Sequence, residues 1–471
     1  MDHAPFLDRA LAIVPRDDTY IAERVSGRLP AFLRGTYYLN GPARFARGPV
    51  KYDHWLDGDG LVCAVAFGGE DGVRITHRFV RTRKLSEEEA AERAIYRTFG
   101  TAFPGDRLNR GVALESPANI SVYPFAGTLL AFGEQGLPSE LDPIALETRG
   151  LFTFRGALTD VTPFSAHPKR DAATGELINF GVSFSAAHPM LNVYSFAADG
   201  TLNWRRRLPL DAPRTIHDFA VTGRHIAFYA SPYVLDAAAI VRRGRTVMDA
   251  LSWRPELGTR LLVLSRETGD VIASIPLGGC YSLHVVNGFD DGGDLVLDVI
   301  EYERPIYEQY RVMPELFTGV GRGRPVRYVA GADGVVHRRA AIAYSHAPDF
   351  PTTDPHDASR AYTEFWMLGI SATGQPGRKF FDELVHADWS RPDRPDVYRD
   401  AAGRFFAGEP AVVSDPSGRE APVLICPMCD AEHGRTVVAI FLARDVARGP
   451  VASVELRNPL PPLFHSYFVT S

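Results

Sequence analysis

The sequence predicts a large all-β fold, and three observations support this class. Glycine (42 residues) and proline (35 residues) are spread through the 471-residue chain, where they separate short runs rich in valine, isoleucine, leucine, phenylalanine and tyrosine, as turns separate strands. Two-residue turns such as Asp199-Gly200 and Gly269-Asp270 join apolar runs and favour antiparallel hairpins. Hydrophobic residues make up 45% of the chain, which is enough for a buried core and excludes a disordered protein.

The hairpins follow one another closely along the chain, with few convincing helices between them. A closed ring of blades suits so many strands because it leaves only short, protected edges. No clean repeat of about 40 residues is visible. The residues alone therefore indicate a large all-β architecture and do not by themselves define a propeller.

Two segments depart from the strand pattern. Residues 85–96 (LSEEEAAERAIY) predict a helix, with Ser86 as its N-cap and three glutamates at the positive end of the helix dipole. Residues 233–253 mix apolar side chains with three arginines, which indicates an amphipathic segment.

Charge and composition exclude several classes of protein. The formal net charge is −6 and the basic residues are scattered, so nucleic acid is not expected as a partner. The N-terminus has no signal-peptide pattern and no window resembles a membrane span, which favours a cytoplasmic protein. Four cysteines do not make a disulfide framework. Cys426 and Cys429 (CPMC) could be half of a zinc site, but no second such pair exists, and two buried thiols are the simpler interpretation.

Four of the fourteen histidines lie beside apolar, strand-like sequence: His167, His217, His284 and His465. They are 50, 67 and 181 residues apart, which excludes a local metal-binding loop. If the fold brought them together, the four imidazoles could share one metal ion. The spacing alone also allows four unrelated strand residues. His54 in HWLDGDG is expected to be structural, and histidines in polar sequence, such as His386, are expected to be solvent-exposed.

The sequence resembles the carotenoid cleavage oxygenases over nearly its whole length. The ordered motifs that carry the resemblance are GTYYLNGPARF, YDHWLDGDGLV, PANISVYPFAGTLLAFGE, AHPK, IHDFAV, SLHVVNGFD, GEPAVVSDP and LPPLFHSYFV. The resemblance implies a seven-bladed β-propeller with a helical and loop cap over the iron-containing face. It also implies a single domain, residues 1–471, with cap insertions that include about 233–253.

The resemblance further implies an iron(II) ion held by His167, His217, His284 and His465. In the family, three glutamates accept hydrogen bonds from ligand imidazoles and thereby fix their orientation. The matching positions here are Glu134 (LLAFGE), Glu364 (YTEFW) and Glu409 (AGEPAVV). The family usually has proline after Glu-Phe, whereas Trp366 follows Glu364-Phe365 in this chain.

The implied activity is cleavage of a C=C bond of a carotenoid or apocarotenoid by O2, with two carbonyl products. Enzymes of the family that cleave stilbenes pair a tyrosine with a lysine directly before the first glutamate. Tyr96 is the candidate tyrosine here, but Gly133 occupies the lysine position, which disfavours activation of a phenol. The alternatives are cleavage of stilbenoid or phenylpropene double bonds, isomerisation without cleavage, and a non-catalytic propeller that presents a binding face.

A polyene substrate must be drawn from a membrane or a micelle. The segment 233–253 matches the part of the family that forms an apolar patch near the tunnel mouth. Val234, Leu235, Val241 and Leu251 are therefore candidates for contact with the substrate or a membrane surface, with neighbouring arginines facing anionic headgroups. The alternative is a connection that only packs over the propeller face.

Overall fold

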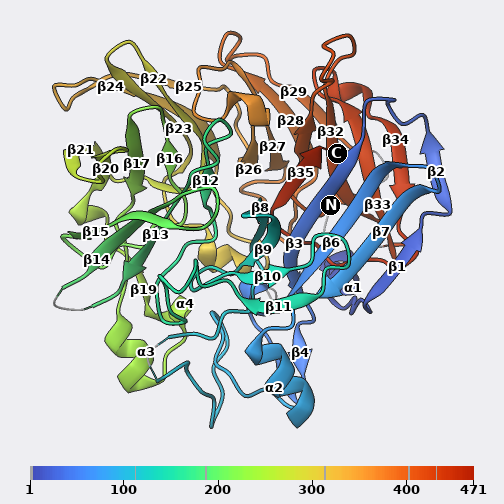
Figure 1. Cartoon of the computed structure of the whole chain (residues 1–471), viewed down its shortest axis with the longest axis horizontal. Helices are drawn as coiled ribbons and strands as arrows, with labels where there is room; N and C mark the ends of the chain where they lie inside the picture. Colours follow the sequence, from blue (N-terminus) through green and yellow to red (C-terminus); the bar gives the residue numbers. More distant parts are fainter. Residues whose placement is uncertain are drawn as a thin grey trace.

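Seven β-sheets of four to six strands form a ring of propeller blades in the computed structural model (Figure 1). The structure describes residues 4–111, 113–185, 188–311, 315–400, 404–430 and 432–470. This arrangement confirms the all-β propeller fold.

The first two sheets lie in the N-terminal third of the chain, apart from one C-terminal strand. The first sheet has the order β1 (Asp18–Ile21), β7 (Gly72–Phe79), β6 (Asp59–Gly69), β3 (Gly35–Ala43) and β35 (Ser466–Thr470). The second has the order β11 (Thr148–Leu151), β10 (Ser139–Leu141), β9 (Thr128–Phe132) and β8 (Ser121–Phe125).

The next four sheets are four-stranded meanders in chain order. The third consists of β12 (Lys169–Arg170), β13 (Leu177–Ser183), β14 (Met190–Phe196) and β15 (Leu202–Pro209). The fourth consists of β16 (Ala220–Val221), β17 (His225–Ala230), β20 (Thr259–Ser265) and β21 (Val271–Gly278). The fifth consists of β22 (Tyr281–Asp291), β23 (Asp294–Tyr302), β24 (Gly323–Ala330) and β25 (Val336–Ala341). The sixth consists of β26 (Ala347–Thr352), β27 (Glu364–Ile370), β28 (Glu383–Asp388) and β29 (Asp396–Arg399).

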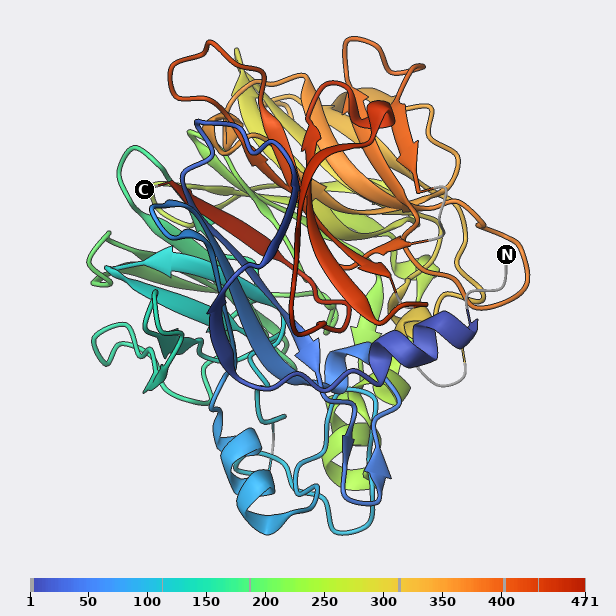
Figure 2. The ribbon, with the colours of Figure 1, turned by 90° about the vertical axis from the view of Figure 1, so that its right-hand side faces the viewer.

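The seventh sheet and the first both combine the two ends of the chain. The seventh has the order β2 (Arg24–Gly27), β34 (Pro450–Glu455), β33 (Arg435–Leu442), β32 (Val423–Asp430) and β30 (Phe405–Phe406), and β31 (Ala411–Val413) also pairs with β32. Figure 2 shows the dark-red C-terminal strand beside the blue N-terminal strands. Because strands from both ends share two sheets, the ring is closed by backbone hydrogen bonds as well as by packing.

Burial along the strands follows their place in the blades. The inner part of a blade packs on both faces, so β32 is buried along nearly its whole length and reads as a continuous apolar run. The outer strand β15 alternates half-buried and exposed residues, as a strand with one solvated face does. The turn Asp199-Gly200 joins β14 to β15 and the turn Gly269-Asp270 lies between β20 and β21, which confirms both predicted hairpins.

Short helices and two ribbons supplement the blades. The α-helices are α1 (Ala4–Leu11), α2 (Arg83–Ala91), α3 (Ala237–Arg243) and α4 (Val247–Ala250). The 3₁₀ turns are η1 (Trp55–Asp57), η2 (Pro255–Leu257), η3 (Tyr307–Tyr310), η4 (Pro355–Asp357) and η5 (Val446–Arg448). The ribbons pair β4 (Ala46–Arg47) with β5 (Val50–Lys51) and β18 (Tyr233–Leu235) with β19 (Leu251–Trp253). Helices α2, α3 and α4 gather on one side of the ring (Figure 1), as the predicted cap requires.

The segment predicted as a helix is one, with a different start, and the amphipathic segment is part helix and part strand. Helix α2 begins at Arg83, and its N-cap is Thr82, whose hydroxyl oxygen accepts a hydrogen bond from the backbone N–H of Leu85 (3.2 Å). Ser86 lies inside the helix and donates to the carbonyl of Thr82 (2.9 Å), so the predicted N-cap at Ser86 is wrong by one turn. The segment 233–253 forms β18, α3, α4 and β19.

Candidate metal centre

The four candidate histidines lie at or just before the first strand of a blade. His167 precedes β12, His217 precedes β16 and His465 precedes β35, whereas His284 lies within β22. The ladder between β22 and β23 shifts register between Ser282 and Val285, on either side of His284. Such an irregularity re-aims a side chain relative to a regular strand.

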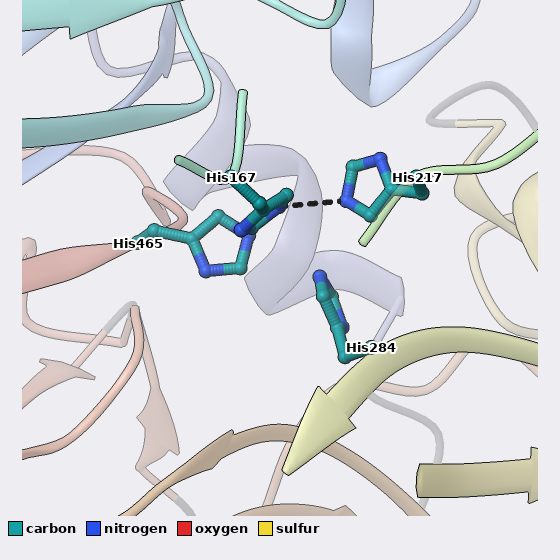
Figure 3. A group of neighbouring side chains, drawn as sticks. All are labelled: His167, His217, His284 and His465. Carbon is teal, nitrogen blue, oxygen red and sulfur yellow. Dashed lines mark hydrogen bonds between the residues drawn. The ribbon is translucent and has the colours of Figure 1, made fainter. Parts of the chain in front are cut away.

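The structure brings the four imidazoles together (Figure 3). One ring nitrogen of each histidine lies within 4.8 Å of those of the other three. The Nε2 atoms of His167 and His217 are 2.9 Å apart. Each side chain is at least nine-tenths buried, with 3% exposure at His167 and His284 and 4% at His465. Among the described residues this is the only cluster of three or more histidine, cysteine or acidic side chains that could share an ion.

Three of the histidines have a carboxylate behind the ring. His217 Nδ1 lies 2.8 Å from Glu134 Oε1, and His465 Nδ1 lies 3.4 Å from Glu409 Oε1, so both glutamates occupy their expected places. His284 Nδ1 lies 2.5 Å from Asp349 Oδ1. A carboxylate at Nδ1 places the proton there and leaves Nε2 as the free nitrogen that a metal requires.

Glu364 does not take part in this arrangement, and its predicted role is wrong. Its carboxylate binds the guanidinium of Arg444 (2.7 Å) and lies 3.3 Å from Nε2 of His386. His386 is itself buried and stacks on Trp366, so it is not solvent-exposed as expected. Glu364 begins β27, the second strand of its blade, whereas the four histidines lie at or just before first strands.

Asp349 holds the position that had been assigned to Glu364. It lies on β26, the first strand of the same blade, and is 1% exposed. The sequence did carry a signal, because Asp349-Phe350-Pro351 has the proline that is missing after Glu364-Phe365. The resemblance predicts a glutamate in this role, and this chain has an aspartate.

Burial and the neighbouring charges set the protonation of the centre. Burial lowers the pKa of His167 well below its usual value, and the adjacent imidazoles lower it further. Burial also lowers the pKa of His465, although the Glu409 carboxylate opposes this. Burial acts the same way on His284, but there the Asp349 carboxylate prevails and raises the pKa. Neutral His167 and His465 rings offer lone pairs to a cation.

The donor set fits a transition metal. His284 Nε2 is fully buried and has no hydrogen-bond partner, which is a costly state for a polar atom unless a cation completes it. Four imidazole nitrogens without a direct carboxylate match the ligand preference of iron, copper, zinc or nickel ions and not that of calcium or magnesium. The three carboxylates behind the rings offset the charge of a bound dication.

Two tyrosines that the sequence analysis did not single out contact these carboxylates. The Tyr307 hydroxyl donates to Glu134 Oε1 (3.1 Å), and the Tyr310 hydroxyl donates to Asp349 Oδ2 (3.0 Å). Both side chains are buried in the 3₁₀ turn η3. Burial, and then the nearby carboxylates, raise the pKa of each phenol well above its usual value, so both remain donors. No pattern in ERPIYEQY reveals contacts with residues so distant in sequence.

An apolar cavity of about 330 Å³ extends to residues that contact the histidines. Its walls come from η1, the cap and the blades and include the following apolar residues: Leu56, Phe99, Leu114, Ile120, Val182, Phe184, Ile216, Leu235, Ile240, Val247 and Leu251. Glu134 and Tyr307, which contact His217, also line it. The carbonyl of Ile120 accepts a hydrogen bond from the backbone N–H of His465 (3.3 Å). The cavity therefore ends beside the histidines.

Gly133, at the position of the lysine of the stilbene-cleaving enzymes, leaves no free space for a side chain unless Ser116 moves. A Cβ atom at Gly133 would lie 2.3 Å from Ser116 Oγ, which lines the cavity. Tyr96, the candidate partner for that lysine, donates its hydroxyl to Glu87 (2.7 Å) and does not line the cavity. This chain therefore lacks the tyrosine–lysine pair of the stilbene-cleaving enzymes, as Gly133 indicates.

A second cavity, of about 280 Å³, borders the histidines. His167, His284 and His465 line it, together with the ion pair between Lys169 and Asp218 (2.7 Å). The centre thus lies between an apolar cavity and a charged one.

The remaining candidates fall outside the centre. Cys426 and Cys429 are buried in β32, where burial raises the pKa of both thiols, which confirms two ordinary buried cysteines. Of the four candidates for contact with substrate or membrane, Leu235 and Leu251 line the apolar cavity, Val234 is half-buried, and Val241 is 48% exposed. None of the helices in the described part of the chain has the length and apolar character of a membrane-spanning helix.

The chain is similar to known proteins along nearly its whole length. A family model described as "Retinal pigment epithelial membrane protein" matches residues 15–470. The apocarotenoid-15,15'-oxygenase of Synechocystis sp. is 28% identical over 471 residues, which cover 97% of this chain and 94% of that protein. The isoeugenol monooxygenase of Pseudomonas nitroreducens is 33% identical over 462 residues, which cover 94% of each. A solved structure of a Synechocystis apocarotenoid oxygenase variant matches with a TM-score of 0.88 over 99% of both chains at 24% identity.

A propeller that surrounds a four-histidine centre and matches these relatives defines an oxygenase. The chain belongs to the family of the retinal pigment epithelial membrane protein and the carotenoid cleavage oxygenases.

Proposed function

We propose that this chain is an iron(II)-dependent oxygenase that cleaves one C=C bond of a carotenoid or apocarotenoid with O2 and releases two carbonyl products. The observation that carries the proposal is the group of four buried histidines together with an apolar cavity whose lining residues Glu134 and Tyr307 contact His217. His167, His217, His284 and His465 would hold the metal, with Glu134, Asp349 and Glu409 behind three of the rings.

Iron(II) held by these histidines would supply activation of O2 for addition across the alkene. The residues of the chain supply binding and orientation. The carboxylates fix the tautomer and direction of the imidazoles. The apolar walls hold the polyene by burial of its surface and keep water away from the reacting bond. No general acid or nucleophile is required.

The cavity supports an uncharged, apolar substrate. Glu115, Glu134 and Asp160 are the ionisable residues other than Tyr307 among the described residues that line it, so it contains carboxylates and no lysine, arginine or histidine. An anionic substrate would find no cationic side chain to pair with, and a phenol would find none to ionise it. Both features favour a polyene with a neutral end.

The second candidate is cleavage of a phenylpropene or stilbenoid. The 33% identity to an isoeugenol monooxygenase favours it, as does a cavity volume at the lower end of the range for ligand pockets, about 300–1,000 Å³. The Tyr307 hydroxyl and the Glu134 carboxylate at the inner end could bind a phenol without ionising it.

Parallel assays separate these functions. Purified protein loaded with iron(II) is incubated with an apocarotenal, isoeugenol and resveratrol under labelled O2, and products are identified by mass spectrometry. Loss of polyene absorbance with labelled aldehydes supports the proposal. Aromatic aldehydes alone would establish the second candidate, and an isomer without label would indicate isomerisation. A non-catalytic scaffold would be indicated if the purified protein retains no stoichiometric iron and if His284→Ala has the same iron content.

We also propose that the α3 region touches a membrane surface from which the polyene enters. Val241 is exposed on α3, beside Arg242 and Arg243 and close to the cavity residue Ile240. Exposed apolar and basic side chains together favour an anionic bilayer. Val241→Asp should reduce co-sedimentation with anionic vesicles and leave turnover of a detergent-solubilised substrate unchanged. Equal co-sedimentation of the variant and the parent would contradict this contact.

We further propose that residues 1–471 fold as one domain. N- and C-terminal strands share two sheets, so separate unfolding of either end would break the ring. A single calorimetric transition is expected, and two separated transitions would contradict it.

A further inference from the structure

We propose that the 3₁₀ turn η3 is a positioning element for the metal centre, in which Tyr307 and Tyr310 each hold the carboxylate that orients a ligand histidine. This inference rests on the proposed function in one respect, namely that the histidines bind a metal. It concerns two residues whose side chains are directed at two different carboxylate–histidine pairs.

Tyr307 closes a compact triangle with Glu134 and His217. Its hydroxyl lies 3.1 Å from Glu134 Oε1 and 2.9 Å from His217 Nδ1, while these two atoms are themselves 2.8 Å apart. The other oxygen, Glu134 Oε2, is buried and has no hydrogen-bond partner. The Glu134 side chain is therefore held at Oε1 alone. Loss of the phenol would leave it with a single partner, the imidazole.

Tyr310 holds the second pair from the side opposite to the imidazole. Asp349 Oδ1 faces His284 Nδ1 (2.5 Å) and the backbone N–H of Phe350 (3.0 Å), whereas Oδ2 accepts from the Tyr310 hydroxyl (3.0 Å). Both oxygens are therefore fixed, and the plane of the carboxylate is defined. Tyr310 is 3% exposed and does not line the apolar cavity. A substitution at Tyr310 acts on Asp349 without changing the cavity wall.

The spacing of the two tyrosines explains why one turn can serve both pairs. Residues i and i+3 of a 3₁₀ turn lie on the same side, so Tyr307 and Tyr310 both face the centre, with ring centroids 5.9 Å apart. His217 and His284, which they serve, are also neighbours, with ring centroids 5.1 Å apart. Displacement of η3 would loosen two ligands at once.

His54 anchors the turn. Its Nδ1 accepts from the backbone N–H of Leu56 (3.2 Å), so its proton is on Nε2, which donates to the carbonyl of Tyr307 (2.8 Å). The imidazole is fully buried. The HWLDGDG motif is therefore structural, as expected, and its histidine supports the turn that carries the two tyrosines.

Metal binding by the whole protein tests the proposal. Metal-free Tyr310→Phe and Tyr307→Phe proteins are titrated with Co²⁺, and affinity and the visible absorption spectrum are recorded. Loss of groups that orient ligands weakens metal binding by about 10- to 100-fold, so Tyr310→Phe should weaken Co²⁺ binding by about tenfold and alter the spectrum. Tyr344→Phe is the matched control, because Tyr344 is a buried phenol that donates to a buried carboxylate, Glu383 (2.6 Å), which contacts none of the four histidines of the centre.

The outcomes separate this inference from the proposed function. The positioning role is supported if Tyr310→Phe binds Co²⁺ more weakly and Tyr344→Phe does not. The two metal-free variants should lose the same thermal stability. The same affinity and spectrum in Tyr310→Phe, Tyr344→Phe and the parent protein would overturn it while leaving the metal centre intact. A parent protein that binds no Co²⁺ or Fe²⁺ would overturn the proposed function as well.

Discussion

Replacement of Asp349 by asparagine tests which acidic residue supports the metal centre. The structure indicates Asp349, whereas the sequence suggested Glu364. Asparagine has nearly the same shape. Its amide oxygen can accept from His284 Nδ1 and the Phe350 N–H, and its NH2 group can donate to the Tyr310 oxygen. The substitution therefore removes the negative charge and keeps the hydrogen bonds.

The expected magnitude follows from that lost charge. A hydrogen bond to a charged group contributes about 1.5–3 kcal/mol and a neutral one about 0.5–1.5 kcal/mol. The difference, about 1.4 kcal/mol, corresponds to a tenfold weaker metal affinity. Asp349 is 1% exposed, so solvent does little to screen the effect. Asp349→Asn should therefore raise the Kd for Fe²⁺ about tenfold.

The assay is anaerobic calorimetric titration of metal-free protein with Fe²⁺, and Glu364→Gln is the control. Glu364 pairs with Arg444 and does not contact the four histidines, so its substitution should leave the Kd unchanged. The reasoning would be refuted if Glu364→Gln bound Fe²⁺ tenfold more weakly and Asp349→Asn had the Kd of the parent protein.

Three further predictions concern stability and specificity. Burial lowers the pKa of His54 to about 3 from 6.5. Since the folded pKa is depressed, only the unfolded chain takes up this proton between pH 6.5 and pH 3, and stability must fall as the pH falls through that window. The loss of unfolding free energy attributable to His54 is about 2 kcal/mol at pH 5. In His54→Gln the unfolding free energy, measured with denaturant, should fall by that much less between neutral pH and pH 5. The same pH dependence in both proteins would contradict a buried neutral His54. Gly133→Ala should lower the free energy of unfolding by about 1 kcal/mol, because the new Cβ displaces Ser116 Oγ from the backbone N–H of Ala118. The same change in a Ser116→Ala background should leave the free energy of unfolding unchanged. Equal losses in both backgrounds would show that Ser116 is not the obstacle. An apocarotenoic acid should bind about tenfold more weakly than the corresponding aldehyde, because carboxylates and no cations line the cavity. Fluorescence-quenching titrations measure both affinities. Tighter binding of the acid would contradict this account of specificity.

The motifs were most informative where one residue type is obligatory. The resemblance predicted that His167, His217, His284 and His465 lie together, and the structure brings them together although chain spacing could not connect them. Glu134 and Glu409 lie in equally distinctive motifs, and both were located correctly beside His217 and His465.

The groups behind the ligands were less predictable because either acidic residue can accept a hydrogen bond. Two acid-Phe segments, Asp349-Phe350 and Glu364-Phe365, lie fifteen residues apart on neighbouring strands of one blade. Only the position of β26 as the first strand of that blade decides that Asp349 meets His284. The start of α2 was misjudged for a similar local reason, because both Thr82 and Ser86 can cap a helix.

The sequence by itself predicted the class of fold from turn residues and apolar runs. Its resemblance to a known family, carried by short motifs, predicted the four histidines and two of the three carboxylates that the structure brings together. Tertiary structure alone decided which acid supports His284, that Ser116 fills the space at Gly133, and that Tyr307 and Tyr310 reach two carboxylates from one turn. These contacts join segments that are distant in the chain. They are fixed by how the blades and the cap pack, which no local pattern records.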